Sequence, residues 1–322
     1  MATVEARVDV VVVAFNSGEQ LRDCVEPLSR ESSINVVVVD NASTDDTLSA
    51  LEDLPVSVIA LDENIGFGGG CNVGWESATA PYVLFLNPDA RLPPEAVLRL
   101  ADVLERTSAG AVAPRIVDPS GSLEWSIRCF PDVRSIYGQA IFAHRLFPGA
   151  DWVDEVIRDP ERYAREAPCD WASGACLLLR REMLEQLGGF DDGFFMYCED
   201  VDLCRRLWDR GSSVVYTPTV VCTHVGGASS PRWRLMQVLV RSRIRYAQKH
   251  FDRGRAIAYR GGVVLNEFTH ILIGRGFRGR LGHALALLAS AGVRTALTEA
   301  TSHTRSTPHE HNAPRGNRQI NR

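Results

Sequence analysis

The sequence predicts an α/β protein with a mainly parallel β-sheet and a basic, helical C-terminal extension. Three observations lead to this fold class. Apolar runs typical of buried strands alternate with helical patterns through the first half of the chain, as expected for parallel strands joined by crossover helices. Apolar strand patterns return after a loosely patterned stretch at 116–170. Basic side chains then gather beyond residue 231, where the pattern is helical.

The individual elements follow from the position of each apolar run. Strands are predicted at 8–15, 34–40, 56–61 and 82–86, and helices at 17–30, from Thr44 onward and after Gly70. Later strands are predicted at 175–180 and 212–218, and later helices at 180–189 and 200–210. Prolines and weak periodicity predict an insertion or acceptor loop at 116–170. Ligands are expected at the carboxyl ends of the strands, where open α/β sheets bind them.

Charge divides the 322-residue chain into unequal parts. Residues 1–231 carry 36 acidic and 18 basic side chains, whereas residues 232–322 carry 4 acidic and 17 basic ones. We therefore predict one large domain at 1–231, a basic amphipathic helical region at 232–301 and a disordered polar tail at 302–322. A hydrophobic content of 45% excludes a largely disordered protein.

The basic region predicts contact with an anionic membrane surface or with another copy of the chain. Its apolar stretches at 261–274 and 282–293 are shorter than the roughly 20 residues needed to cross a bilayer. Helices lying at the membrane interface fit this pattern, and a solvated helical face is the alternative. A nucleic-acid partner is disfavoured by the apolar stretches between the arginines. Because the apolar run near residue 10 is too short for a secretory signal, we expect a cytoplasmic protein, peripheral at the inner face of the cell membrane.

Two predicted strands end in polar clusters. The strand at 34–40 ends at Asp40, which can bind a base or ribose, although capping of the next helix explains this cluster when it stands alone. The strand at 82–86 stops at Asn87, Pro88 and Asp89. A carboxylate there can hold a hard cation that binds diphosphate oxygens, and an Asx-Pro turn is the alternative. Two acidic strand ends together favour a ligand site.

Three further motifs carry polar or flexible groups. A glycine-rich segment at 66–74 lacks the spacing of a dinucleotide fingerprint and the lysine of a P-loop, so a tight turn and a ligand cradle both fit. Glu199 and Asp200 lie beside aromatic residues that can raise a carboxyl pKa and equip it as a base, although acidic residues also suit a helix N-terminus. His224 follows a strand and precedes two glycines, as a structural residue or as a cation or diphosphate ligand.

Taken in order, these motifs resemble the inverting family-2 glycosyltransferases with the GT-A fold, and within them the bacterial rhamnosyltransferase-like branch. The shared segments are VVVAFN, VDNASTDDT, NIGFGGGCNVG, FLNPDA and FFMYCEDVDLCRR with the downstream HVGGAS, over about residues 8–230. The resemblance implies a Rossmann-like mixed, mainly parallel sheet flanked by helices. It also implies an inverting, metal-dependent transfer of a sugar from a nucleotide donor.

The resemblance assigns a role to each motif. The nucleotide-sugar pocket would be formed by Ala14, Asn16, Asp40, Asn41, Gly66, Phe67, Asn72, Asn87, Trp171 and Gly174. Asp89 and His224 would hold a divalent cation, Mg²⁺ or Mn²⁺. Asp200 would be the catalytic base, with Glu199 beside it. Asn87 departs from the Asp-x-Asp pattern of many relatives and removes one negative charge from the metal site.

The implied donor is dTDP-rhamnose, and UDP sugars such as UDP-galactofuranose are the alternative. The implied acceptor is a glycan or a polyprenyl-diphosphate-linked glycan in cell-wall or polysaccharide assembly. A catalytically silent nucleotide-sugar-binding or scaffold protein is the alternative of a different class. A nucleotidyltransferase is disfavoured because the segment AFNSGEQL after the first strand contains no lysine or arginine.

Overall fold

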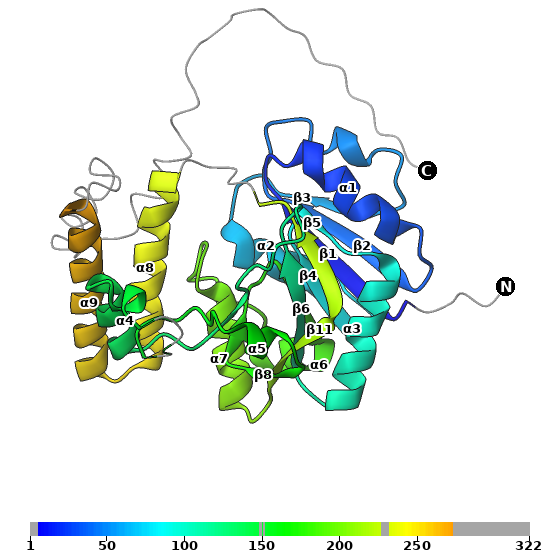
Figure 1. The fold of residues 1–322 in the computed structure, drawn as a ribbon. Coiled ribbons are helices and arrows are strands. Elements are labelled where there is room, and N and C mark those ends of the chain that lie inside the picture. Colours follow the sequence, from blue (N-terminus) through cyan, green and yellow to red (C-terminus); the bar gives the residue numbers. More distant parts are fainter. Residues whose placement is uncertain (1–5, 148–149, 151, 227–231, 273–322) are drawn as a thin grey trace, which may run out of the picture.

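The computed structural model describes residues 6–147, 150, 152–226 and 232–272. The elements in chain order are β1 (Val8–Ala14), α1 (Gly18–Ser29), β2 (Ile34–Asp40), η1 (Ser49–Leu51), β3 (Ser57–Ala60), α2 (Gly66–Glu76), β4 (Tyr82–Leu86), β5 (Ala90–Arg91), α3 (Pro94–Thr107), β6 (Ala111–Val117), β7 (Ile127–Arg128), α4 (Val133–Ala140), η2 (Ala143–Arg145), α5 (Pro160–Tyr163), β8 (Ala167–Cys169), β9 (Trp171–Ala172), β10 (Cys176–Arg180), α6 (Arg181–Leu187), α7 (Glu199–Asp209), β11 (Val214–His224), α8 (Arg232–His250) and α9 (Arg253–Leu272). Figure 1 shows a sheet domain beside a helical unit that contains α4, α8 and α9.

The large sheet has the strand order β3-β2-β1-β4-β10-β6-β11-β5, with β8 paired to β11. The first four strands of this order are parallel, as predicted. β10 is antiparallel to both β4 and β6, and β11 is parallel to β6. The apolar runs of β1 and β4 are buried along their whole length, because helices cover both faces of the sheet.

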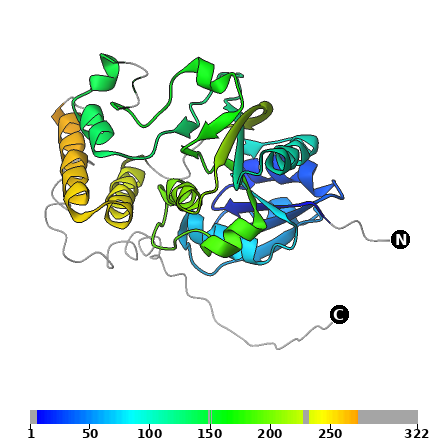
Figure 2. The same cartoon turned by 90° about the horizontal axis from the view of Figure 1, so that it is seen from below.

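Two apolar clusters fill the space between the sheet and its helices. One contains side chains of α1 and α3, and the other contains side chains of α2, α6 and α7. Figure 2 shows these two sets of helices on opposite faces of the sheet. Six cysteines are buried thiols within these two clusters: Cys24, Cys71, Cys169, Cys176, Cys204 and Cys222. α3, which packs against the sheet, has no counterpart among the predicted helices.

The antiparallel strand β10 brings a distant segment to the carboxyl edge of the parallel strands. Cys176, the first residue of β10, pairs with Leu86, the last residue of β4. The backbone N–H of Asn87 donates to the carbonyl of Ala175 at 2.9 Å. At the same edge His224 pairs with Ala90. The topology therefore gathers the ends of β4 and β11 and the start of β10.

In the first half, one predicted helix is absent and another begins earlier than predicted. No helix begins at Thr44, and only the short turn η1 forms nearby. Side chains hold this segment as a loop: Asn16 Oδ1 accepts from the Thr44 N–H and Asp45 Oδ1 from the Thr47 N–H. The helix predicted after Gly70 begins four residues earlier, at Gly66, whose positive φ of 86° suits glycine.

The C-terminal helices pack against the insertion. α8 and α9 share an apolar cluster with Ile136 of α4, to which α8 contributes Val240 and Ala247. α4 thus joins residues 133–140 to residues 232–272, across the predicted domain boundary at 231. Among the helices that the structure describes, none is long and apolar enough to cross a membrane. The apolar stretch at 282–293 and the tail at 302–322 lie outside the described residues.

Candidate active site

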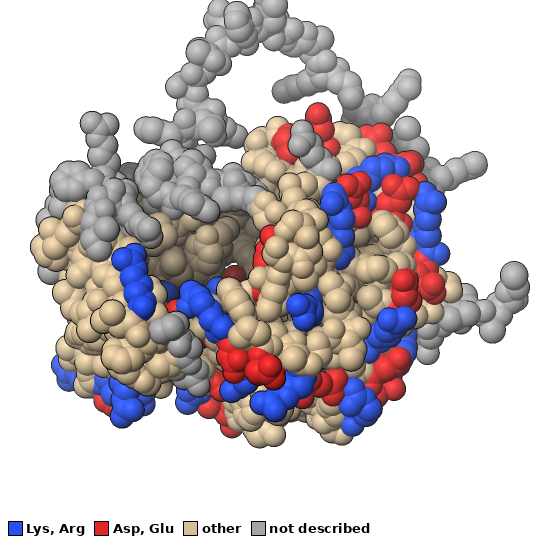
Figure 3. All heavy atoms as spheres, in the orientation of Figure 1, with Lys and Arg blue, Asp and Glu red and all other residues tan. Residues whose placement is uncertain are grey.

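A cavity of about 390 Å³ lies at the carboxyl edge of the sheet, between the sheet and α8. Eight of the predicted site residues line it: Asn41, Phe67, Asn87, Asp89, Gly174, Glu199, Asp200 and His224. Figure 3 shows the hollow between the helical unit and the sheet domain, with acidic atoms on its wall. The cavity therefore brings together residues that are far apart in the sequence.

Six predicted residues do not line this cavity: Ala14, Asn16, Asp40, Gly66, Asn72 and Trp171. Asp40 and Asn72 make hydrogen bonds within the surrounding structure instead. Asp40 Oδ1 accepts from the Ser43 N–H at 3.2 Å, which holds the turn after β2. Asn72 Nδ2 donates to the Phe190 carbonyl at 2.9 Å, and its Oδ1 accepts from the Phe190 N–H at 2.8 Å. Asn72 thus ties the glycine-rich helix α2 to the loop before α7.

Asn41 organises the loop that leads into α2. Its Oδ1 accepts from the Ile65 N–H at 2.9 Å, and its Nδ2 donates to the Gly66 carbonyl at 3.0 Å. Asn64, which sequence reasoning missed, accepts from the Gly66 N–H and lines the cavity beside Asn41. A side chain on Gly66 would collide with the backbone of Phe195. The glycine therefore allows α2 to approach the loop before α7 closely.

Asp89 and His224 face each other at the end of β4. Asp89 Oδ1 lies 3.3 Å from His224 Nε2, and Glu124 Oε2 lies 3.3 Å from His224 Nδ1. The hydrogen bond to Asp89 is the main reason that the pKa of His224 rises to about 9. Glu124 was not predicted, because a single glutamate in a loosely patterned segment carries no signal of its own. Its position fixes the orientation of the imidazole, as outer partners of metal-binding histidines do.

The donor set at this point fits a divalent cation held in part by a substrate. Asp89 supplies a carboxylate, His224 an imidazole and Asn87 an amide whose nitrogen lies 3.4 Å from His224 Nε2. Mg²⁺ is commonly bound through one or two carboxylates together with substrate phosphates. Among the described residues, no group of three or more His, Cys, Asp and Glu side chains is arranged to hold an ion. The fit is therefore to an ion that shares its ligands with a diphosphate.

Glu199 and Asp200 begin α7 and line the same cavity as Asp89. Burial raises the pKa of both carboxyl groups, and the charge of Asp200 raises that of Glu199 further. Asp200 accepts hydrogen bonds from the Gly174 N–H at 3.1 Å and the Val201 N–H at 2.8 Å. Glu199 Oε2 is buried and has no hydrogen-bond partner among the described residues. Asp200 is thus the better-stabilised anion of the two, and a proton bound by the pair is expected on Glu199.

Helix α8 holds both the loop before α7 and the first turn of α7, which carries these carboxyl groups. Asp202, which is fully buried, lies 2.7 Å from Lys249 Nζ and 2.7 Å from His250 Nε2. Asp191 binds Lys249 and Arg245, and the Ser242 hydroxyl donates to the Met196 carbonyl at 2.7 Å. Many basic side chains of the C-terminal region therefore have internal partners. α8 is a structural part of the cavity, to which it also contributes Leu235.

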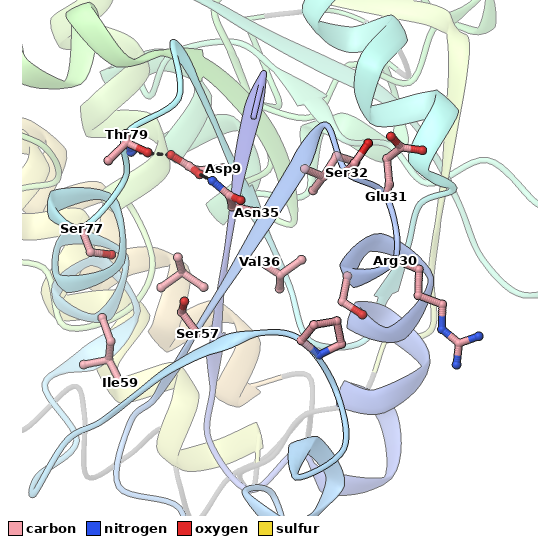
Figure 4. A pocket seen from close by; sticks show the side chains of 14 residues that line it. Asp9, Arg30, Glu31, Ser32, Asn35, Val36, Ser57, Ile59, Ser77 and Thr79 are labelled. Carbon is pink, nitrogen blue, oxygen red and sulfur yellow. Dashed lines mark hydrogen bonds between the residues drawn. The ribbon is translucent and has the colours of Figure 1, made fainter. Parts of the chain in front are cut away.

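A larger cavity of about 580 Å³ lies at the opposite end of the sheet. Figure 4 shows Asp9 there with Asn35 and Thr79. The Asp9 carboxylate accepts from Asn35 Nδ2 and from the N–H groups of Thr79 and Ala80. These bonds anchor the segment before β4 and satisfy both oxygens of the Asp9 carboxylate. The smaller cavity, with its carboxyl groups and histidine, is the candidate active site.

Comparison with known proteins points to one family. The family model described as glycosyl transferase family 2 matches residues 9–188. An N-acetylglucosaminyl-diphospho-decaprenol L-rhamnosyltransferase from Mycobacterium tuberculosis is 34% identical, over 69% of this chain and 77% of the relative. The rhamnosyltransferase WbbL of Escherichia coli is 26% identical, over 76% of this chain and 96% of the relative.

Solved structures with the same fold confirm the predicted architecture. The mannosyltransferase PcManGT from Pyrobaculum calidifontis, solved with GDP-Man and Mn²⁺, gives a TM-score of 0.52 at 20% identity and covers 94% of this chain and 81% of its own. GalNAc-T7, solved with UDP, GalNAc and Mn²⁺, gives a TM-score of 0.59 at 14% identity and covers 93% of this chain and 58% of its own. The likeness confirms the mixed sheet flanked by helices.

Proposed function

Because this chain belongs to glycosyl transferase family 2, we propose that it transfers L-rhamnose from dTDP-rhamnose to a polyprenyl-diphosphate-linked glycan, with inversion at the anomeric carbon. The observation that carries this proposal is the meeting of Asp89, His224 and Asp200 in one cavity. Both bacterial relatives are rhamnosyltransferases, which supports rhamnose as the sugar. The name of the mycobacterial one includes a diphospho-decaprenol substrate, which supports the acceptor class. The product would serve cell-wall or polysaccharide assembly.

In the proposed transfer, Asp200 and Glu199 act on the acceptor side of the breaking bond. The acceptor hydroxyl attacks the anomeric carbon as the bond to the nucleotide diphosphate breaks on the opposite face. Asp200, an anion held by the N–H groups of Gly174 and Val201, takes the proton of the attacking hydroxyl. Glu199, which keeps its own proton, adds no second charge beside the base. A single displacement of this kind inverts the configuration.

Asp89 and His224 are proposed to act at the other end of the breaking bond, with Asn87 beside them. A divalent cation, Mg²⁺ or Mn²⁺, would neutralise the charge of the departing diphosphate when bound there. Asp89 contributes a negative charge to hold it, and Glu124 keeps the His224 ring in place. Asn41, Asn64 and Phe67 are proposed to face the nucleotide, since they line the cavity on the side of β1 and β2.

The proposed function is tested by product formation. The purified protein is incubated with Mn²⁺, a polyprenyl-diphosphate-linked N-acetylglucosamine and one of two donors, dTDP-rhamnose or UDP-galactofuranose. We expect a rhamnosylated lipid with an inverted anomeric centre, identified by mass spectrometry and NMR. Transfer only from the UDP sugar would replace the donor. Neither transfer nor donor hydrolysis above background would favour a catalytically silent binding protein instead.

Replacing Asp89 by alanine should weaken donor binding only when a divalent cation is present. The variant loses a carboxylate that we propose to hold the ion, whereas contacts to the base remain. Calorimetric titration with dTDP, with and without Mn²⁺, measures the difference. Asp23→Ala is a matched control, since Asp23 lies on α1 and makes an exposed ion pair with Arg91. Equal dTDP affinity of wild type and Asp89→Ala in Mn²⁺ would refute the metal role.

We also propose that the helical unit contacts an anionic membrane surface through an apolar patch. This patch comprises Ile141, Leu146, Phe147, Trp152, Phe268 and Leu272, each more than half exposed. The rings of Phe147 and Trp152 lie 5.6 Å apart, and Phe142 contacts His270 of α9 at 4.8 Å. Arg145 lies over the Phe142 ring beside the patch. Exposed aromatic groups next to a cation suit the headgroup region of a bilayer.

Replacing both Phe147 and Trp152 by serine should weaken binding to phosphatidylglycerol-containing vesicles by about tenfold or more, because two aromatic side chains no longer enter the interface. Vesicle co-sedimentation measures the loss. The double variant Leu48→Ser and Val58→Ser removes two similarly exposed apolar groups from the sheet domain and should bind normally. Unchanged vesicle binding of the Phe147 and Trp152 variant would contradict the proposed membrane surface.

A further inference from the structure

Arg128 is a partly buried arginine that forms no salt bridge within the part of the chain that the structure describes. Its guanidinium carbon lies 5.2 Å from the centre of the Trp171 ring on the neighbouring strand β9. Its Nε is buried and has no hydrogen-bond partner within the described part of the chain. Arg205 has the same spacing over the Phe130 ring, but it is paired with Asp209. Because a partly desolvated cation without a partner is unfavourable, Arg128 indicates a place for an anion.

A second unmatched donor lies two residues before Arg128 in the chain. Ser126 is only 5% exposed, and its hydroxyl has no hydrogen-bond partner among the described residues. Side chains two residues apart in an extended segment point to the same side. The Ser126 carbonyl accepts from the Ser173 N–H at 3.0 Å, and Ser173 lines the active-site cavity. A hydroxyl and a guanidinium, both hydrogen-bond donors, together suit phosphate oxygens.

The location of Arg128 indicates that this anion is not the diphosphate of the donor. On the same segment, Glu124 contacts His224 at the end of the cavity where the departing diphosphate is expected. Arg128 lies four residues further along and reaches Trp171 and the surroundings of Asp200 instead, since its charge acts on the Asp200 carboxyl. Asp200 is the group proposed to receive the acceptor's proton. An anion at Arg128 therefore belongs on the acceptor side.

We propose that Arg128, with Ser126, binds the diphosphate that links the acceptor sugar to its lipid. This inference rests on the proposed function and adds the feature by which the acceptor is recognised. The Trp171 ring holds the guanidinium in a fixed orientation through a cation–π contact. The planar guanidinium can then donate two parallel hydrogen bonds to phosphate oxygens. Binding the diphosphate places a hydroxyl of the attached sugar at Asp200.

Two acceptors with the same sugar test this assignment. One is a short-chain lipid diphosphate of N-acetylglucosamine, and the other is an alkyl glycoside of the same sugar without phosphate. Arg128→Gln should raise the KM for the diphosphate acceptor by about 10- to 100-fold, the usual loss for a hydrogen-bonded charge. The KM for the alkyl glycoside and the KM for the donor should stay within about twofold. Arg128→Lys, which keeps the charge without the planar fork, should lie between wild type and Arg128→Gln.

The matched control is Arg205→Gln, which removes an arginine of similar stacking that has its own partner. It should leave the ratio of the two acceptor KM values unchanged. Thermal melting shows whether each variant is folded, and Arg128→Lys serves if Arg128→Gln is not. The alkyl glycoside is also an internal control, because its turnover by each variant reports on the rest of the site.

Each alternative result would contradict a specific part of this proposal. A higher donor KM in Arg128→Gln would assign the arginine to the donor's diphosphate. An equal fall in kcat with both acceptors would show that Arg128 acts only through Asp200. Identical acceptor KM ratios in wild type and Arg128→Gln would remove Arg128 from substrate binding while leaving the proposed function intact. Failure of the wild type to glycosylate either acceptor would overturn the proposed function itself, and this inference with it.

Discussion

Replacing Asp200 by asparagine is expected to reduce kcat by about 10²- to 10⁴-fold, the range lost with a general base. The asparagine oxygen can still accept a hydrogen bond from Gly174 or Val201, so the loop should keep its shape. What is lost is the group that accepts the acceptor's proton. Turnover by the purified variant, with dTDP binding measured in parallel, checks the prediction. Near-normal turnover would refute the assignment of Asp200 as the base.

Glu199→Gln provides the sharpest comparison. Because Glu199 is the protonated member of the pair, an uncharged glutamine of similar shape should reduce kcat far less than Asp200→Asn does. A reversed order of the two effects would make Glu199 the base. Asp209→Asn, at the exposed end of the same helix, is the matched control and should keep normal activity.

The pH dependence of the wild type follows from the same site. Burial raises the pKa of Asp200 above its ordinary value, despite the opposing backbone hydrogen bonds and the charge of Arg128. The basic form is therefore lost as the pH falls through this raised pKa, and kcat should decline at a higher pH than an exposed aspartate would give. In Asp200→Asn, the residual activity should lack this acidic limb.

Replacing Asp202 by asparagine is expected to destabilise the protein by about 3–5 kcal/mol, as removal of one partner from a buried ion pair does. Asp202 is fully buried and binds Arg206 as well as Lys249 and His250 of α8. The variant would leave these cationic groups without their shared anion. Urea-induced unfolding, followed by tryptophan fluorescence, measures the change. An unfolding midpoint equal to that of the wild type would show that the cluster adds little stability.

The sign of the associated pH effect can also be stated. Burial alone would raise the pKa of Asp202, but the hydrogen bond from His250 and the charges of Arg206 and Lys249 outweigh it and lower the pKa. The folded value therefore lies below the unfolded one, near 3.9. The stabilisation is present above the unfolded pKa and is lost as the pH falls through the folded pKa. Asp209→Asn should unfold within about 0.5 kcal/mol of the wild type, because its ion pair is exposed.

Much of the fold could be predicted because its signals are local. The apolar runs of β1, β2 and β4 are strands that are buried on both faces. Such strands can be predicted from their own residues alone. The helix expected from Thr44 was wrong because residues 16 and 17, far away in the sequence, hold residues 43–47 as a loop through hydrogen bonds. A side chain that comes from a distant segment leaves no trace in local periodicity.

The roles within the site divide in the same way. Motifs at strand ends identified Asp89 and His224, and the acidic pair beside aromatic residues identified Asp200; these three residues line one cavity. Asn72 belongs to an equally recognisable motif, yet its amide is engaged with Phe190 outside that cavity. Glu124 has no motif and was missed. Its contact with His224 exists only because β11 brings residue 224 beside the loop that follows β6.

The sequence by itself determined the buried strands β1, β2 and β4, the acidic strand ends and the excess of basic residues after residue 231. These follow from residue type and from spacing over a few positions, which hydrophobic period and charge reveal directly. Only the tertiary structure decided what the basic residues bind. Lys249 and His250 meet Asp202 because α8 packs across the loop before α7, and Arg128 meets Trp171 because β7 pairs with β9. Such long-range pairs depend on how whole elements pack, a property that no short segment encodes.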